Sequence, residues 1–204
     1  MSPANTNADT TRQRLRTELR RARRELPPAV RIAGAQSLAA QLLSLPFAPD
    51  EGHVAGYWAM DGEIALHAWQ LALPDAVVYC LPVLHDEGQL RFAPWRPGQA
   101  LKANRYGIPE PDVAPGDLLL PAQLQLVVAP LVGFDSIGNR LGMGAAWYDR
   151  SFAFRQTSPA PPWLVGAAFN QQRVDSLAPQ AWDVALDAVC TDTSTYLASG
   201  AATA

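Results

Sequence analysis

Residues 124–134, LQLVVAPLVGF, are apolar on both of the faces that a β-strand presents. Residues 76–84, AVVYCLPVL, have the same character. Such strands are typical of a mostly parallel sheet with helices on both faces, because neither face of the sheet meets water. Shorter runs predict further strands at residues 53–59, 90–95, 163–169 and 188–191, with 90–95 as an edge hairpin.

Helices are predicted before and between these strands. Over residues 11–25, apolar side chains recur every three or four positions and arginines occupy the other faces. Pro27 and Pro28 end this helix, and Pro28 suits the first position of a second helix that runs to Leu43. Further helices are expected at residues 64–73 and 144–155.

Length and composition favour one α/β domain. The chain has 204 residues, 49% of them hydrophobic, which is enough for one sizeable core. We expect this domain to span residues 11–197, between a disordered tail at 1–10 and a frayed tail at 198–204. The polar N-terminus and the lack of an apolar run of roughly 18 residues predict a cytoplasmic protein with no membrane partner.

The charged residues are few and unevenly placed. A net charge of -3 gives no overall basic field for nucleic acid. Seven of the 15 arginines nevertheless fall between Arg12 and Arg24, and the only lysine is Lys102. Any binding of phosphate must therefore rely on arginine and backbone N–H groups. Cys80 and Cys190 lie in apolar runs, which predicts reduced core thiols.

Residues 127–150, VVAPLVGFDSIGNRLGMGAAWYDR, are the most informative segment for function. A buried strand is followed by a turn, by Arg140 with Gly142 and Gly144, and then by a helical pattern. A glycine loop before a helix presents unpaired N–H groups and a positive dipole end to an anion such as phosphate. By spacing alone an ordinary turn is an equally good interpretation. The segment lacks the lysine of a Walker-type loop.

Within this segment, GFDSIGNRLGMGAAWYDR resembles the hallmark of the 5-formyltetrahydrofolate cyclo-ligase family, F-D-x-x-G-x-R-L-G-x-G-x-G-x-Y-D. Other segments that follow in the family's order are RQRLRTELRRARREL, YWAMDGEIAL, LPVL, NRYGIPEP and WDVALDAVCTD. The resemblance implies a fold like that of NagB, RpiA and the CoA transferases. It also implies cyclisation of 5-formyltetrahydrofolate to 5,10-methenyltetrahydrofolate, with Mg²⁺ as cofactor, ATP as co-substrate and ADP and phosphate as products.

The resemblance places ATP between the N-terminal helix and the glycine loop. The residues implied are Arg12, Arg16, Arg140, Leu141, Gly142, Met143, Gly144, Ala145, Ala146, Trp147 and Tyr148. Arg140 and Tyr148 are also expected to act in catalysis. The remaining arginines of the helix, Arg14, Arg20, Arg21, Arg23 and Arg24, are expected to form a solvated face. An RNA-binding helix is a further alternative, which the acidic remainder of the chain disfavours.

The folate is expected to contact Trp58, Met60, Glu63, Tyr106 and Trp147. A carboxylate at Glu63 suits the donor-rich edge of a pterin, although a glutamate at a helix start also complements the helix dipole. The alternative for the aromatic residues is that they pack in the hydrophobic core.

The resemblance assigns Mg²⁺ to Asp149 and Asp183. Carboxylate oxygens are the ligands that Mg²⁺ prefers, and Asp149 falls one turn inside the predicted helix after the glycine loop. The alternative for each of these aspartates is a structural role, as a helix cap or as a partner in a local ion pair.

Ala145 and Ala146 depart from the family, in which many relatives have lysine or glycine and then glycine. This departure motivates a second hypothesis, a non-catalytic folate-binding relative. A sugar-phosphate or CoA-handling enzyme is a third, based on fold analogy alone. In each case the expected partners are small molecules, and the chain is expected to be a monomer or a small homo-oligomer.

Overall fold

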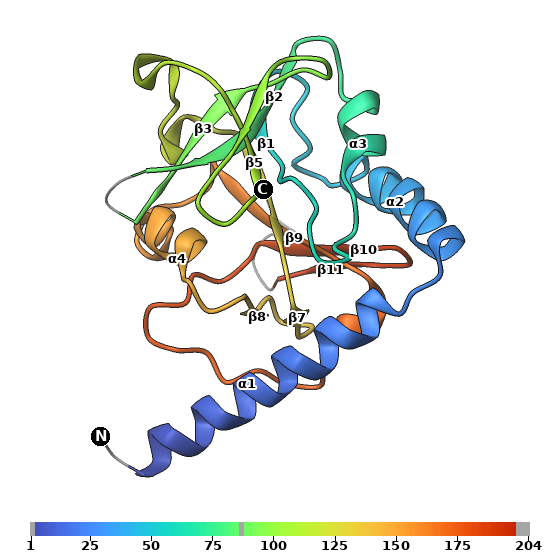
Figure 1. Ribbon diagram of the computed structural model, residues 1–204, viewed down its shortest axis with the longest axis vertical. Coiled ribbons are helices and arrows are strands. Elements are labelled where there is room, and N and C mark those ends of the chain that lie inside the picture. The colour runs from blue at the N-terminus through green and yellow to red at the C-terminus, as the bar shows by residue number, and fades with distance from the viewer. Residues whose placement is uncertain (1–2, 86–87, 199–204) are drawn as a thin grey trace.

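A seven-stranded sheet forms the centre of the computed structural model, which describes residues 3–85 and 88–198 (Figure 1). Across the sheet the strands are β11 (Thr195–Leu197), β10 (Ala188–Thr191), β9 (Trp163–Ala168), β6 (Leu126–Pro130), β1 (Gly52–Ala55), β2 (Val77–Leu84) and β3 (Leu90–Pro94). The inner strands pair in parallel, whereas β3 and β11 pair antiparallel at the two edges. The predicted mostly parallel sheet and the edge hairpin at 90–95 are confirmed.

Side chains alternate between two apolar layers along these strands, which explains why the sequence is apolar on both strand faces. On one face, α2 (Pro28–Leu43) and α3 (His67–Ala72) cover a cluster that includes Val54 and Val128 (Figure 1). On the other, α4 (Trp147–Ser151) and the 3-10 helix η3 (Ala153–Gln156) cover a cluster that includes Val127. Cys80 and Cys190 are buried free thiols, as predicted.

The direction in which strands are added to the sheet reverses between β1 and β6. From β1 the chain adds β2 and β3 on one side, and β6, β9 and β10 then follow on the other. In an open α/β sheet, ligands bind outside the carboxyl ends of the strands at such a reversal, because the two connections leave in opposite directions and open a crevice. The fold itself therefore indicates where to look for the site.

The predicted strand over residues 125–134 is divided in the structure. After β6 the chain turns and forms β7 (Gly133–Phe134), which pairs with β8 (Arg140–Leu141) in a separate ribbon. The Gln172 side chain allows the chain to leave the sheet here, because its Nε2 donates to the carbonyls of Leu131 and Val132 at 2.9 and 3.0 Å. A buried carbonyl that leaves a sheet requires such a partner.

Two predicted helices are shorter in the structure. The carbonyl of Ile64 accepts a hydrogen bond from the Tyr57 hydroxyl at 2.6 Å, and α3 begins only at His67. Gly144 and Ala146 have φ of 99° and 52°, outside helical geometry, so α4 begins at Trp147. A second hairpin, β4 (Leu101–Ala103) with β5 (Pro109–Pro111), has no clear signal in the sequence.

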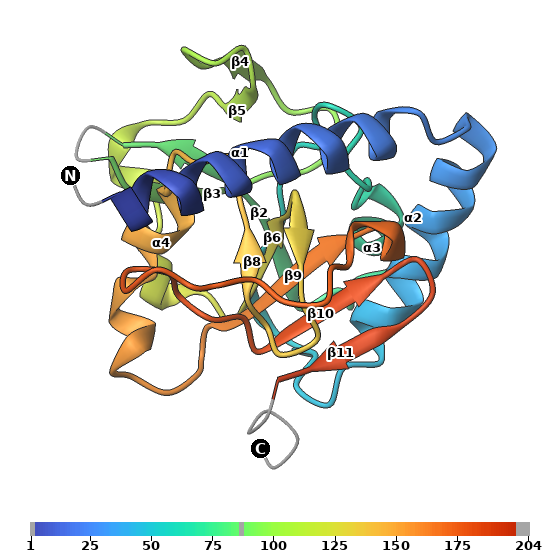
Figure 2. The same cartoon turned by 90° about the horizontal axis from the view of Figure 1, so that it is seen from below.

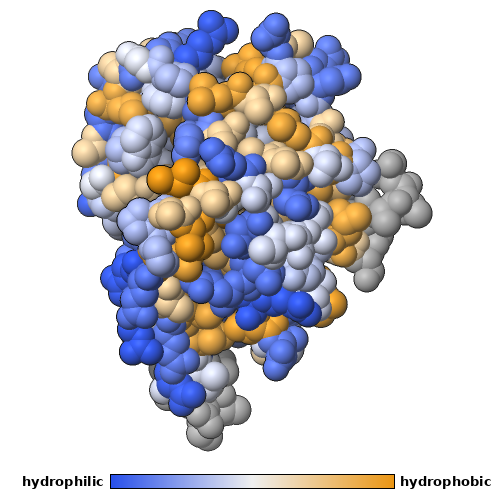
Figure 3. Space-filling model, turned by 90° about the vertical axis from the view of Figure 1, so that its right-hand side faces the viewer, coloured by the Kyte–Doolittle hydropathy of each residue, from blue (hydrophilic) through white to orange (hydrophobic). Residues whose placement is uncertain are grey.

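The first helix, α1 (Pro3–Arg24), lies across the edge of the sheet where β6 ends (Figure 2). It starts at Pro3 rather than at residue 11 and so includes most of the segment expected as a tail; proline is tolerated in a first helical turn. Leu19 packs against Val132 and Leu141. On the face shown in Figure 3, hydrophilic residues lie along the lower left side, above the grey atoms. Residues 199–204, most of the expected C-terminal tail, lie outside the described residues.

Arg23 fixes α1 to the reversal point of the sheet. Its side chain is 0% exposed, which contradicts the solvated position expected for it. The guanidinium donates from Nη1 to the carbonyl of Leu131, after β6, and from Nε to the carbonyl of Asp61, after β1, both at 2.9 Å. Nη2 also lies 3.0 Å from the Asp61 carboxylate. One side chain thus joins three segments of the chain.

Among the described residues, no helix is both long and apolar enough to cross a membrane.

Replacing Arg23 with methionine should reduce the free energy of unfolding by about 3–5 kcal/mol, because the Leu131 and Asp61 groups lose their buried charged partner. Arg21→Met is the matched control: Arg21 is on the same helix, its side chain is 71% exposed, and we expect a change within about 0.5 kcal/mol. Urea denaturation measures both. Equal losses in the two variants would contradict the anchoring role of Arg23.

Candidate functional site

The candidate site lies at the carboxyl ends of β1 and β6, beneath α1. The chain after β1 supplies Trp58, Met60 and Glu63, and the ribbon after β6 leads to the glycine loop at residues 142–146. Trp58 and Met60 are 36% and 38% exposed, so both present apolar surface to solvent beside the buried Glu63. The predicted folate residues after β1 therefore lie at the reversal point that the topology indicates.

The Glu63 carboxylate is held at the bottom of this region. One oxygen accepts a hydrogen bond from the Met60 N–H at 3.0 Å, and the other lies 3.6 Å from Arg23 Nη2. The side chain is only 12% exposed. Burial raises the pKa of Glu63, although the Met60 hydrogen bond and the Arg23 charge act in the opposite direction. Glu63 is a carboxylate with its acceptor capacity partly unused in a poorly hydrated place.

Asp61 holds the turn between Trp58 and Glu63 against α1. Its carboxylate pairs with Arg20, Arg23 and Arg24 at 2.7, 3.0 and 3.4 Å. Burial acts to raise its pKa, but the hydrogen bond and charge of Arg20 outweigh it and lower the pKa. Asp61 also has a φ of 51°, a left-handed conformation that a non-glycine residue keeps only where its surroundings hold it.

Tyr148 brings α4 into the same region. Its pKa is raised, first by burial and then by the neighbouring charge of Glu63. Its hydroxyl has no hydrogen-bond partner within residues 3–85 and 88–198. Because burial raises its pKa, the phenol stays neutral and can donate a hydrogen bond to a bound molecule.

Four charged side chains of alternating sign form a row beside Tyr148. Arg140 donates from Nη2 to Asp149 and from Nη1 to the carbonyl of Val184, and its side chain is 7% exposed. Burial lowers the pKa of Arg140, whereas Asp149 and then Asp183 act to raise it. Asp183 in turn lies 3.5 Å from Arg12. The structure thus brings together the two predicted metal ligands and two of the predicted ATP-binding arginines.

The glycine loop continues this row toward α1. Arg16 donates from Nε to the carbonyl of Gly142 at 2.9 Å, which places the predicted ATP-binding arginine against the loop. A side chain built at Gly142 would meet nothing within 4 Å among the described residues, so the loop is open there. Met143 is 53% exposed. The loop therefore offers accessible backbone beside two arginines.

The earlier turn, residues 135–139, is not part of the anion-facing loop. Asp135 is 1% exposed, and its carboxylate accepts hydrogen bonds from the backbone of Ile137, Asn139 and Leu177. The turn is closed by its own side chain at the far end of the β7–β8 ribbon from Gly142. Here the interpretation as an ordinary turn is correct, and only the second half of the predicted loop faces the site.

An aromatic pair forms the outer end of the site. Tyr106, at the tip of the β4–β5 hairpin, meets Trp147 edge to face at a centroid distance of 6.5 Å. Tyr106 is 56% exposed. On the β1 side, Trp58 meets Trp95 at 5.8 Å. Trp58 and Tyr106 are therefore exposed, whereas Trp147 is partly buried and packs against the core cluster that includes Val127.

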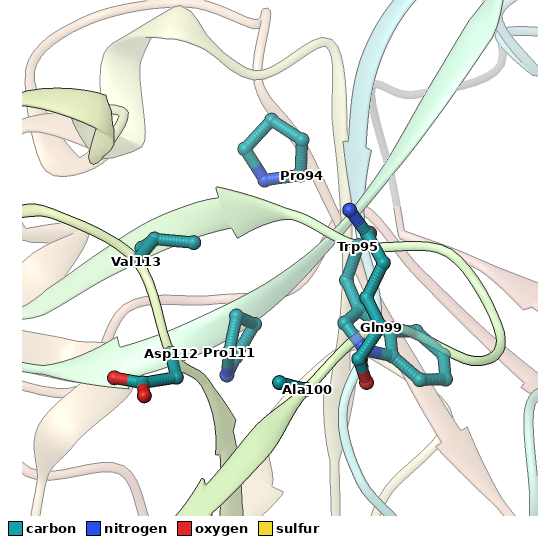
Figure 4. A pocket seen from close by; sticks show the side chains of 7 residues that line it. All are labelled: Pro94, Trp95, Gln99, Ala100, Pro111, Asp112 and Val113. Atoms are coloured by element: carbon teal, nitrogen blue, oxygen red, sulfur yellow. Dashed lines mark hydrogen bonds between the residues drawn. The ribbon is translucent and has the colours of Figure 1, made fainter.

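A shallow hollow near Trp95 lies outside this constellation (Figure 4). It is formed at the base of the β4–β5 hairpin by Trp95, Gln99, Pro111 and their neighbours. None of the predicted site residues lines it. This hollow is therefore separate from the residues that the sequence predicts to bind ligands.

The expectation of a solvated arginine face is wrong for Arg23 and Arg20, whose side chains are 0% and 35% exposed. It is confirmed for Arg14 and Arg21, which are 82% and 71% exposed. The spacing of the arginines along the helix would have indicated which of them face the protein. Positions 12, 16, 20 and 23 follow one another at steps of four, four and three, so all of them share the helix face assigned to Arg12 and Arg16.

Fold and site together define a single-domain α/β protein with charged and aromatic side chains gathered at the reversal point of a mostly parallel sheet. The model of the 5-formyltetrahydrofolate cyclo-ligase family matches residues 8–192. The chain belongs to this family.

Curated relatives agree with this assignment. The 5-formyltetrahydrofolate cyclo-ligase of Haemophilus influenzae is 36% identical over 179 residues, which cover 86% of this chain and 94% of the relative. That of Escherichia coli K12 is 35% identical over 182 residues, covering 87% and 98%. The solved structure of Aquifex aeolicus 5,10-methenyltetrahydrofolate synthetase has the same fold, with a TM-score of 0.75 at 24% identity and coverage of 91% and 92%.

Ala146 has a left-handed φ of 52°, in which an alanine is strained and a glycine is not. We expect Ala146→Gly to leave the free energy of unfolding unchanged or to raise it by up to about 1 kcal/mol. The control is the neighbouring Ala145→Gly, which removes no such strain and should cost about 0.5–1 kcal/mol. Thermal unfolding of the two variants measures the contrast, and equal destabilisation would show that Ala146 is not strained.

Proposed function

We propose that this chain catalyses the ATP- and Mg²⁺-dependent cyclisation of 5-formyltetrahydrofolate to 5,10-methenyltetrahydrofolate. The observation that carries the proposal is the convergence, at one reversal point, of a buried acceptor at Glu63, a free phenol at Tyr148 and an arginine-flanked glycine loop. The family, to which relatives named for this activity belong, supports the same reaction.

The pterin end of the folate binds at the Glu63 side of the crevice. A pterin presents several N–H donors along one edge, and Glu63 is a carboxylate whose hydrogen bonds are not all used by the protein. Trp58 and Met60, each more than a third exposed, supply apolar surface beside it. In this orientation the formyl group on N5 lies toward Tyr148 rather than toward solvent.

ATP binds between α1 and the glycine loop, with its phosphates toward Arg16, Arg12 and the N–H groups of residues 142–146. The accessible backbone at Gly142 favours this position. Ala145 and Ala146 keep their N–H groups, so the departure from the family removes a possible lysine without removing the backbone donors.

Asp149 and Asp183 are the residues that would hold Mg²⁺. Within the described part of the chain no group of three or more metal-ligating side chains is assembled. Two carboxylates nevertheless fit this ion, because Mg²⁺ is usually bound by one or two carboxylates together with substrate phosphates. Bound there, the ion would neutralise charge on the transferring phosphoryl group. Arg140 orients Asp149 by direct contact.

The reaction needs positioning and charge neutralisation more than a protein nucleophile. The formyl oxygen attacks the γ-phosphorus of ATP, and ADP leaves. N10 of the folate then adds to the formyl carbon, which the phosphorylated oxygen activates, and N10 loses its proton. Loss of phosphate leaves the methenyl bridge. An amide oxygen is a poor leaving group until it is phosphorylated, which is why ATP is consumed. In this proposal the neutral Tyr148 hydroxyl donates a hydrogen bond to the reacting oxygen, and the arginines and loop N–H groups bind the phosphates.

The absorbance of the methenyl product tests the activity directly. With 5-formyltetrahydrofolate, ATP and Mg²⁺, we expect a rise that requires ATP, and a fall in kcat/KM of about 100-fold or more in Asp149→Asn. The matched control is Asp50→Asn, at an exposed aspartate that precedes β1 and so lies at the opposite end of that strand from the site, which should match the unchanged protein. Folate binding without any ATP-dependent turnover would instead favour the non-catalytic folate-binding alternative.

The raised pKa of Glu63 predicts how folate binding depends on pH. The carboxylate form accepts the pterin hydrogen bonds, so affinity should fall as the pH decreases through a pKa above the ordinary 4.5. Glu63→Gln should bind about tenfold or more weakly at neutral pH and lose this acidic dependence. Fluorescence titration with 5-formyltetrahydrofolate without ATP measures both. An identical acidic decline in the variant would show that another group is responsible.

A further inference from the structure

Arg20 belongs to the row of arginines along one face of α1, yet the proposed reaction gives it no part. Its Nε donates to the Asp61 carboxylate at 2.7 Å. Neither of its Nη atoms has a hydrogen-bond acceptor within residues 3–85 and 88–198. The side chain is 35% exposed. One nitrogen of the guanidinium is therefore fixed by the protein, and the other two are available to a ligand.

The position of Arg20 along α1 places it between the two proposed ligand sites. It follows Arg16 by four residues and precedes Arg23 by three, which are axial distances of about 6 and about 4.5 Å. Arg16 donates to the carbonyl of Gly142 in the glycine loop, and Nη2 of Arg23 lies 3.6 Å from the Glu63 carboxylate. Around the helix, Arg20 is turned from these two arginines by about 40° and about 60°. It therefore stands between the nucleotide end and the pterin end of the candidate site.

Arg23 and Arg140 are the buried guanidinium groups of the candidate site, and the protein itself uses their donors. Arg23 is 0% exposed and donates from all three of its guanidinium nitrogens. Arg140 is 7% exposed and donates from both Nη atoms. Such groups act on a ligand through their charge, whereas Arg20 can also form direct hydrogen bonds with an anion.

Asp61 holds Arg20 in place without neutralising the charge around it. Its carboxylate is shared by Arg20, Arg23 and Arg24, at 2.7, 3.0 and 3.4 Å. Glu63 is the second carboxylate here, so three positive charges meet two negative ones. One positive charge is left for a ligand. The anion that would reach this place from the glycine loop is the terminal phosphate of ATP, whose oxygens suit a forked pair of N–H donors.

We propose that Arg20 is a catalytic residue, whose Nη atoms donate hydrogen bonds to the γ-phosphoryl group as it passes from ATP to the formyl oxygen. This inference rests on the proposed function, because it adds a group to the same reaction. In this step the formyl oxygen forms a bond to the γ-phosphorus. The bond from that phosphorus to the β,γ-bridging oxygen breaks, and its electron pair leaves with ADP. A guanidinium that Asp61 already holds stabilises the charge on the transferring group.

The kinetics of Arg20→Gln test this role. We expect kcat to fall about 100-fold, because the lost contact acts on the transferring group. Arg24→Gln is the matched control, since it also removes one positive charge and one partner of Asp61, but about one helical turn farther from the glycine loop. It should keep kcat within about twofold. An unchanged kcat in Arg20→Gln, or an equal fall in the two variants, would overturn the proposal.

Titration with ATP and with ADP, in the absence of folate, separates a contact with the γ-phosphate from a structural role. Arg20→Gln should bind ATP about three- to tenfold more weakly. Its affinity for ADP should be unchanged, which also shows that the variant is folded. Arg20→Lys keeps the charge without the forked donors and should recover part of the affinity for ATP.

Equal weakening of ATP and ADP binding, or no weakening of either, would count against a contact between Arg20 and the γ-phosphate and overturn the proposal. If the unchanged protein does not convert 5-formyltetrahydrofolate, the proposed function fails instead. The comparison of ATP with ADP then still decides whether Arg20 reaches the γ-phosphate, because it requires no turnover.

Discussion

The buried guanidinium of Arg23 is the interaction on which the arrangement of this molecule depends. It binds backbone carbonyls after β1 and after β6, the two strands between which the sheet reverses direction. A buried charge is costly unless its hydrogen-bonding capacity is used, and here the carbonyl of Leu131, the carbonyl of Asp61 and the Asp61 carboxylate use it. The connections that leave the reversal point in opposite directions are thereby tied to one helix.

The same anchor sets the position of the groups that act on ligands. Along a helix, each residue advances about 1.5 Å, so Arg16 and Arg12 lie about 10 and 16 Å from Arg23 on the same face. Their contacts with Gly142 and Asp183 are consistent with this spacing. A helix docked one turn out of register would place neither guanidinium at the loop. Structural and ligand-facing arginines therefore form one continuous row, in which the buried member determines where the others stand.

Much of the fold was predictable because both faces of its strands are buried. Val127 and Val128 belong to apolar clusters on opposite faces, which is the arrangement that their continuous apolar sequence predicts. The β7–β8 and β4–β5 ribbons were not predictable, since strands of two or three residues carry too little pattern. The spacing of Arg23 from Arg12 and Arg16 indicates its helix face, but its burial was not predictable, because its partners Leu131 and Asp61 are distant in sequence and only the folded chain brings them near. The ring contact between Tyr106 and Trp147 was likewise not predictable, because these residues come together only in the folded chain.

The candidate site is largely buried at one end and exposed at the other, and this difference matches the chemistry proposed for it. At its inner end the Glu63 side chain is only 12% exposed, and burial raises the pKa of both Glu63 and Tyr148, so little water reaches the place where the formyl group is expected. Scarce water strengthens each hydrogen bond to the reacting oxygen and protects a phosphorylated intermediate from hydrolysis. At its outer end Tyr106 is 56% exposed. A folate that binds as proposed, with its pterin at Glu63, would follow this gradient outward, and that direction would bring N5 and N10 toward the phosphates of an ATP bound at the glycine loop.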